Sequence, residues 1–117
     1  MALTWIDKPF EKLSNLELYN IMTLRQEVFI VEQDCVYLDN DGKDEGAWHI
    51  WAEDKPSNIV AYARILAPNV SYEEASLSRI VTHLDYRSKG LGQELMKRSL
   101  DLMESLYLTA WTSSDPD

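Results

Sequence analysis

A strand-like run, a loop with two glycines and a helical pattern follow one another late in this chain and constrain its fold more than any other feature. The apolar run is Leu77–Thr82, the loop reads Arg87-Ser88-Lys89-Gly90-Leu91-Gly92, and the helical pattern continues to about Leu106. The N–H groups of such a loop and of the first helical turn have no partners within the helix, and the helix dipole adds positive potential there. A phosphate is therefore favoured at this end of the helix.

The composition of the loop makes it a candidate pyrophosphate site. A side chain at Gly90 or Gly92 would hold a phosphate away from the backbone amides. Arg87 and Lys89 add positive charge, in a chain with eleven Lys and Arg against twenty Asp and Glu. An ordinary turn between a strand and a helix can have the same residues. A Walker loop and a Rossmann fingerprint are both excluded, because neither Lys-Ser/Thr nor a third glycine follows at the required spacing.

Four blocks of the sequence, taken together, resemble the GNAT superfamily of N-acetyltransferases. The segments Leu77–Thr82 and Tyr86–Met96 resemble motif A of that superfamily. The three earlier blocks resemble its ElaA-like subfamily, and they are Leu24–Gln33, Tyr37–Gly42 and Ala61–Leu66. The likeness covers most of the chain. Four blocks in the same order are far more specific than one glycine loop.

The resemblance implies acetyl transfer from acetyl-CoA, as co-substrate, to an amine of a small molecule or peptide, without a metal. In the family the pantetheine arm pairs like an extra strand with the residues that match Ile80 and Val81. The resemblance places the pyrophosphate on Arg87 to Gly92. The backbone N–H of Val81 is the expected donor to the thioester oxygen, on which negative charge develops.

The order of the patterns predicts an α+β fold of one domain, residues 1–117, with helices flanking a mixed, mostly antiparallel central sheet. This agrees with the three-layer GNAT-like architecture that the resemblance implies. Strands are expected at about 2–7, 48–53, 59–66 and 73–82, and a last one from Tyr107 to Trp111. The last strand should lie parallel to the one before the glycine loop, because a crossover helix joins them.

Two helices are expected. Ser14-Asn15-Leu16-Glu17 has the form of a capping box and starts a helix that runs from about Asn15 to Val28. The following Phe29-Ile30-Val31 is expected to lead into a buried loop. The helix after the glycine loop should pack through one apolar face, made of Leu95, Met96, Leu102, Met103 and Leu106.

The charge balance bears on partners and location. The net charge is −9 and the isoelectric point is about 4.6, so nucleic acid and anionic membranes are not expected partners. The same negative charge attracts cations, which would favour an amine substrate. The alternative is that the charge serves only to keep the protein in solution. The single cysteine, Cys35, can form no intrachain disulfide, and no apolar run of eighteen residues is present. We therefore expect a cytoplasmic protein.

The acidic stretch from Asp39 to Gly46 resembles a calcium loop only superficially. With the glycine of an EF-hand placed at Gly42, the first and last ligand positions would hold Tyr37 and Trp48. A solvated acidic turn is the favoured interpretation, and no metal site is predicted.

Several side chains are candidates for catalysis or for the substrate pocket. Glu32 follows an apolar run, so partial burial could raise its pKa and make it a general base; a carboxylate hydrogen-bonded to backbone is the alternative. His49 is a candidate for the pocket or a packed histidine. Cys35 could be a nucleophile, but direct transfer needs none. Arg25, Arg64 and Arg79 either bind a substrate carboxylate or hold the acidic loop in ion pairs, and Asp41 is a further candidate for the substrate pocket.

The C-terminal part departs from the family pattern, in which a further helix and two strands follow the strand matching Tyr107–Trp111. That helix covers the coenzyme and often provides a tyrosine that protonates the thiolate. Without it, the last strand would be an open sheet edge that favours a homodimer. The alternative to an acetyltransferase is therefore an inactive remnant that serves as a CoA-binding or dimerisation module.

Overall fold

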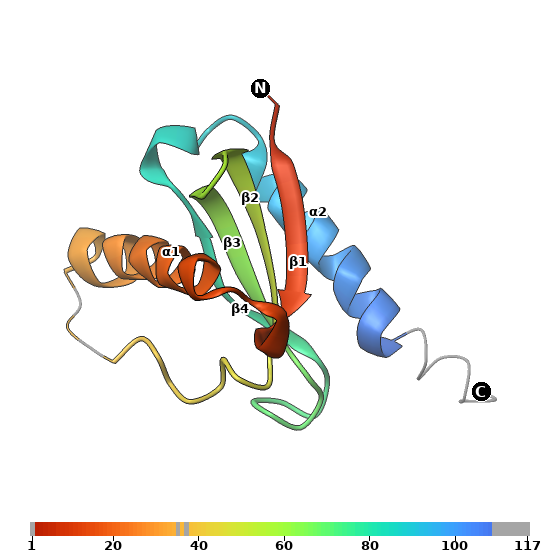
Figure 1. Cartoon of the computed structure of the whole chain (residues 1–117). Helices are drawn as coiled ribbons and strands as arrows, with labels where there is room; N and C mark the ends of the chain where they lie inside the picture. The colour runs from red at the N-terminus through yellow and green to blue at the C-terminus, as the bar shows by residue number, and fades with distance from the viewer. Residues whose placement is uncertain (1, 35, 37, 109–117) are drawn as a thin grey trace.

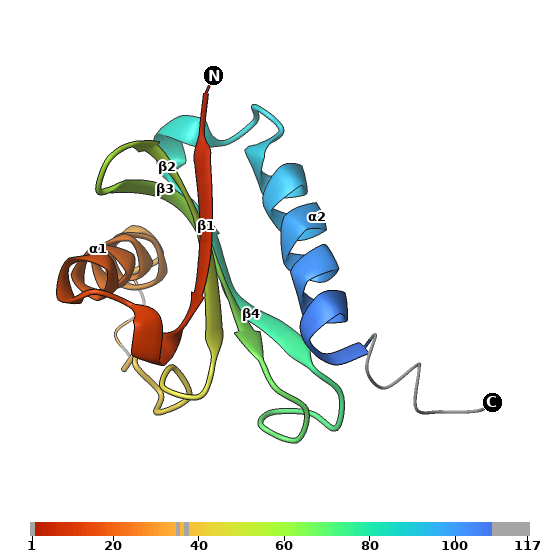
Figure 2. The same ribbon diagram turned by 45° about the vertical axis from the view of Figure 1, so that its right-hand side comes forward.

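In the residues that the computed structural model describes, 2–34, 36 and 38–108, one antiparallel sheet has a helix on each face (Figure 1). The strands lie in sequence order, β1 (Thr4–Pro9), β2 (Trp48–Lys55), β3 (Asn58–Leu66) and β4 (Ser76–Thr82). Figure 2 shows α1 (Asn15–Gln26) on one face of the sheet and α2 (Leu91–Met103) on the other. The predicted α+β class, with a sheet flanked by helices, is confirmed.

Alternation along the central strands creates two cores. Ile50 and Ala52 of β2 belong to the core beneath α2, whereas Trp51 between them belongs to the core beneath α1. This is the period-two pattern of a sheet covered on both sides. The buried residues beneath α2 include Ala61, Ala63, Ile65, Leu91, Leu95 and Met103. Those beneath α1 include Ile21, Leu24, Val28, Ile59, Tyr62 and Val81.

The first helix begins as predicted and ends differently. Ser14 accepts from the amide of Glu17, and the Glu17 side chain accepts from the amide of Ser14, which completes the capping box. The helix continues past Gln26 as a π-helical turn, Glu27–Glu32, in which Val28 is buried and Val31 is exposed. The predicted end at Val28 and the buried loop are wrong. A helical turn pairs backbone groups that a buried loop would leave without partners.

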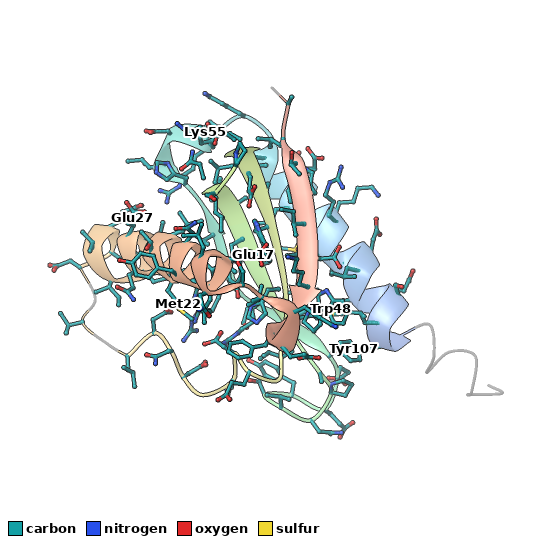
Figure 3. All side chains as sticks on the ribbon, in the orientation of Figure 1. Glu17, Met22, Glu27, Trp48, Lys55 and Tyr107 are labelled. Carbon is teal, nitrogen blue, oxygen red and sulfur yellow. The ribbon has the colours of Figure 1, made fainter. Side chains whose placement is uncertain are left out.

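The second helix also ends in a π-helical turn, Glu104–Leu108, so the start of the predicted strand at Tyr107 is wrong. Tyr107 packs instead against the core beneath α2, as Trp48 also does (both labelled in Figure 3). Residues 109–111 and the expected parallel pairing lie outside the described residues. The predicted apolar face is partly wrong, since Met96 is exposed. The face that packs on the sheet follows i, i+4 spacing and contains Leu91, Leu95, Ser99 and Met103.

No helix in the described part of the chain is both long and apolar enough to cross a membrane.

Candidate functional site

The predicted anion loop connects β4 to α2, and its backbone twice enters the left-handed region. A 3-10 turn, Leu84–Tyr86, follows β4, and Ser88 and Gly90 then have φ angles of 66° and 80°. Gly90 is the N-cap of α2 and offers no side-chain cap. The amide of Glu94 donates to the Gly90 carbonyl at 3.2 Å. The helical amides before it therefore have no acceptor within α2 and can receive an anion at the positive end of the helix.

Neither glycine of the loop is enclosed by protein. A Cβ atom added at Gly90 would meet no atom within 4 Å, and one at Gly92 would meet only Thr82 Oγ1, at 3.9 Å. The positive φ of Gly90 is itself a reason for glycine there. Gly92 has neither a positive φ nor a close neighbour, so the protein alone does not require its small size. Both positions leave room for a ligand such as a pyrophosphate to approach the backbone closely.

Arg87 lies at the start of this loop and is held from two sides. Its Nε donates to the carbonyl oxygen of Thr82 at 3.0 Å. Its two Nη atoms donate to the two carboxylate oxygens of Glu32, at 2.6 and 2.9 Å. The side chains of both partners remain about one-third exposed, at 34% and 36%.

The expectation that Glu32 is partly buried with a raised pKa is wrong. Glu32 is exposed in the π-helical turn after α1. The hydrogen bonds from Arg87 hold the pKa of the Glu32 carboxyl below its usual value. A carboxylate with a lowered pKa and a bound guanidinium is a poor proton acceptor, so this geometry gives no support to a role as general base.

Lys89, the second cation of the loop, lies over the ring of Tyr86, with 5.7 Å between Nζ and the ring centroid. The Tyr86 hydroxyl donates to the carboxylate of Asp54 at the end of β2. This bond raises the pKa of Tyr86 and lowers that of Asp54. The 3-10 turn before the loop is thereby anchored to the β2–β3 hairpin.

A bulge in β4 lies between Ser78 and Val81 and so includes Ile80, one of the two residues predicted to bind the pantetheine arm. Val81 pairs with Tyr62 and Ser78 pairs with Arg64, so β4 uses one residue more than β3 over this stretch. Arg79 within the bulge has a φ of 52°. Ile80 is exposed and Val81 is buried. Among the described strands β4 pairs with β3 alone, so its other edge has no strand partner there.

The acidic loop is held by arginines on three different elements, and the expectation of a solvated turn is wrong. Asp39 and Asp44 are 4% and 6% exposed. Arg25 of α1 binds both, with 2.8 Å to Asp39 Oδ2 and 2.7 Å to Asp44 Oδ1. Arg64 of β3 binds Asp44 at 3.0 Å, and Arg79 of β4 binds Asp39 at 2.8 Å. The three arginines therefore form ion pairs with the loop, which was one of the two roles expected for them.

Asp41 belongs to the same network and makes it sensitive to acid. Arg64 donates to both of its carboxylate oxygens, at 2.8 and 3.0 Å. These bonds are the main reason that the pKa of Asp41 lies far below its ordinary value of 3.8. The amide of Lys43 and the charge of Arg79 lower this pKa further, whereas partial burial opposes the shift. Burial lowers the pKa of Arg25 and Arg64, but the bonds to Asp44 and Asp41 outweigh it and raise both.

Replacing Asp41 by asparagine is expected to weaken the acid sensitivity of folding. A carboxyl with a depressed folded pKa stabilises the fold above its unfolded pKa, here about 3.8, and that stability is lost as the pH falls through the folded value. Urea denaturation at several pH values should show a lower free energy of unfolding for Asp41→Asn than for wild type at neutral pH. This difference should begin to narrow below about pH 4 and should keep narrowing as the pH falls further. Asp101→Asn, in an exposed pair on α2, is the control. A constant difference at all pH values contradicts the expectation.

His49 is a packed and satisfied histidine. It is fully buried, with its Nε2 3.0 Å from the carbonyl oxygen of Asp44 and its Nδ1 2.6 Å from the hydroxyl of Tyr62. A carbonyl can only accept, so Nε2 carries the proton and Nδ1 accepts from Tyr62. Burial lowers the pKa of His49 and raises that of Tyr62. The neutral ring therefore links β2 and β3 to the acidic loop.

A cavity of about 430 Å³ opens between α1 and the acidic loop. Met22 points from α1 toward this space (Figure 3). One wall is apolar and the other is polar, and the lining residues are Phe10, Leu18, Met22, Gln26, Asp39, Asn40, Gly42, Asp44 and Glu45. The predicted pocket residues Arg25, Asp41, His49 and Arg64 do not line it. Two of them bind its acidic wall instead, since Arg25 donates to Asp39 and Asp44 and Arg64 donates to Asp44.

The sequence interpretation missed two features of this region: the Glu32–Arg87 pair and the cavity beside α1. No local pattern indicates either, since each brings together segments far apart in the sequence. The nucleophile considered at Cys35 lies outside the described residues. Among the residues that the structure does describe, no three His, Cys, Asp or Glu side chains are grouped to hold a metal ion.

Comparison with known proteins adds to this geometry. A family model described as the acetyltransferase (GNAT) family matches residues 12–116. A UPF0039 protein from Synechocystis is 38% identical over 96 residues, covering 82% of this chain. Protein ElaA from Escherichia coli is 37% identical over 103 residues, covering 85% of this chain. The chain spans only 62% and 65% of the length of these two relatives.

Solved structures agree with the sequence relatives. An acyl-CoA N-acyltransferase from Pseudomonas aeruginosa superposes with a TM-score of 0.86 at 37% identity, over 92% of this chain and 74% of that one. The crystal structure of Escherichia coli ElaA superposes with a TM-score of 0.83 at 35% identity, over 89% of this chain and 71% of that one. The chain therefore belongs to the acetyltransferase (GNAT) family, and ElaA and the UPF0039 proteins are its homologues.

Proposed function

We propose that this chain is an N-acetyltransferase domain that binds acetyl-CoA and passes its acetyl group to a primary amine. The observation that carries the proposal is the loop between β4 and α2. This loop combines helical amides that have no acceptor within the helix, two glycines with space around their Cα atoms, and the cations Arg87 and Lys89. It also directly follows a strand whose outer edge has no partner among the described strands.

The parts of the coenzyme are assigned by their chemistry. The pyrophosphate would lie on Arg87 to Gly92, where the donors are concentrated. The pantetheine amides would pair with the outer edge of β4 at Ile80 and Val81, as an added strand does. The acetyl group would then lie beside the bulge, with the Val81 N–H assigned to the thioester oxygen.

Acetyl-CoA supplies the acetyl group as a thioester. The neutral amine attacks the carbonyl carbon, the C–N bond forms, the C–S bond breaks, and the electron pair leaves with sulfur. The attacking nitrogen loses one proton and the departing thiolate takes one up, so the products are an amide and a free thiol. An aliphatic amine with a pKa near 10.4 is only about one part in 2,500 neutral at pH 7, equivalent to roughly 4.6 kcal/mol. A base or a water relay is therefore needed for such an amine, whereas an α-amine near 7.8 costs only about 1 kcal/mol.

The cavity beside α1 is our candidate for the acceptor site. Its apolar wall fits a hydrocarbon portion and its polar wall, which includes the exposed Glu45, fits an ammonium group. Arg79 connects this cavity to the proposed acetyl position, because it belongs to the β4 bulge and binds Asp39 of the cavity wall at 2.8 Å. The net charge of −9 also attracts a cationic amine.

Titration calorimetry of acetyl-CoA with wild type and Arg87→Glu tests the proposal. Reversing the charge removes charge-assisted bonds to the pyrophosphate and adds repulsion, so the affinity should fall by more than about tenfold. Absence of binding by wild type, or equal binding by the variant, contradicts the assigned site. Binding without release of free thiol in the presence of a panel of amines would favour the alternative, a CoA-binding module without turnover.

A further inference from the structure

We infer that Glu32 is a tethered anion that competes with the pyrophosphate of the coenzyme for Arg87 and so sets the affinity of the site. The inference rests on the proposed function, because it concerns the same loop. Glu32 binds both Nη atoms of Arg87, at 2.6 and 2.9 Å. This bidentate arrangement of a carboxylate on a guanidinium is the one that phosphate oxygens also adopt. Glu32 therefore occupies the donors that the proposed ligand would use.

The alternative role, in which Glu32 orients Arg87 for the ligand, is not needed. Arg87 Nε already donates to the Thr82 carbonyl oxygen at 3.0 Å, and Thr82 is the last residue of β4. This bond fixes the guanidinium beside the loop from the strand side. Removing the charge of Glu32 leaves that bond intact, so it frees donors without releasing the side chain.

The pair is placed so that a stronger anion can displace the carboxylate. Both side chains are about one-third exposed, and exposed ion pairs are weak. A hollow of about 280 Å³, lined by Glu32, Val31 and His83 among others, adjoins the pair and gives the carboxylate room to move. Whether it moves or stays, its charge near a pyrophosphate is unfavourable. Both cases predict the same sign: neutralising Glu32 strengthens binding.

The test compares acetyl-CoA affinities of five proteins by titration calorimetry: wild type, Glu32→Gln, Glu27→Gln, Arg87→Gln and the double variant Glu32→Gln/Arg87→Gln. We expect Glu32→Gln to bind roughly three- to fivefold more tightly, the range that an exposed ion pair allows. Glu27 is exposed in the same π-helical turn and lines the same hollow, so Glu27→Gln makes the same change in net charge and should stay near wild type. In the Arg87→Gln background the gain should be smaller, because the part that comes from competition for the Arg87 donors is lost and only the repulsion of the pyrophosphate remains.

The outcomes separate this inference from the proposed function. If Arg87→Gln weakens binding while Glu32→Gln leaves it unchanged or weakens it, the site stands and competition by Glu32 is wrong. Equal tightening by Glu27→Gln and Glu32→Gln would reduce the effect to net charge and also overturn the inference. If none of the five proteins binds acetyl-CoA, the proposed function fails and this inference fails with it.

Discussion

Replacing Arg25 by methionine should lower the free energy of unfolding by about 3–5 kcal/mol, the usual cost of breaking a buried ion pair from one side. Arg25 is completely buried, and it donates to Asp39 through Nε, to the Asp39 carbonyl through Nη2 and to Asp44 through Nη1. Methionine fills similar space without a charge. The two carboxylates would remain almost inaccessible to water with fewer donors, and that loss of compensation causes the destabilisation.

The measurement is urea denaturation at neutral pH, with Lys97→Met as the matched control. Lys97 pairs with Asp101 on the exposed face of α2, and both side chains are more than half exposed. An exposed helical pair of this kind contributes only about 0.3–0.5 kcal/mol. A similar small effect for both variants would show that the acidic loop is not held by Arg25 in the way that its distances indicate.

The features that the sequence predicted well depend on residues close together in the chain. The capping box needs only Ser14 and Glu17, three positions apart, and it is present. The β4–loop–α2 unit is likewise contiguous, so its backbone form followed from two glycines placed between a strand pattern and a helix pattern. Local hydrogen-bonding rules are sufficient for such units.

The errors concern charged residues whose partners come from distant segments. Glu32 was interpreted from its apolar neighbours, but its environment is set by Arg87, 55 residues later. Asp39 and Asp44 look like a solvated turn because acidic residues are usually exposed. They are buried because Arg25, Arg64 and Arg79 converge on them from α1, β3 and β4. Nothing in the local pattern states which acidic and basic residues will meet.

Replacing Gly90 by alanine should weaken acetyl-CoA binding by roughly 10- to 100-fold, whereas the same change at Gly42 should leave binding unaltered. Both glycines have left-handed backbones, with φ angles of 80° and 83°, and a Cβ atom at either would meet no protein atom within 4 Å. The conformational cost of alanine is therefore alike at the two positions, about 1–2 kcal/mol. Only the methyl group at Gly90 would stand between an anion and the amides at the start of α2.

This comparison separates the two reasons for glycine at position 90. Thermal denaturation should show similar losses of stability for Gly90→Ala and Gly42→Ala, because each loss comes from the backbone angle alone. Calorimetry with acetyl-CoA should then distinguish them, since a methyl group that prevents one or two charge-assisted N–H contacts removes about 1.5–3 kcal/mol of binding free energy. If both variants lose stability and both bind acetyl-CoA like wild type, Gly90 serves only the turn. The amides of α2 would then have to receive some other anion, or none.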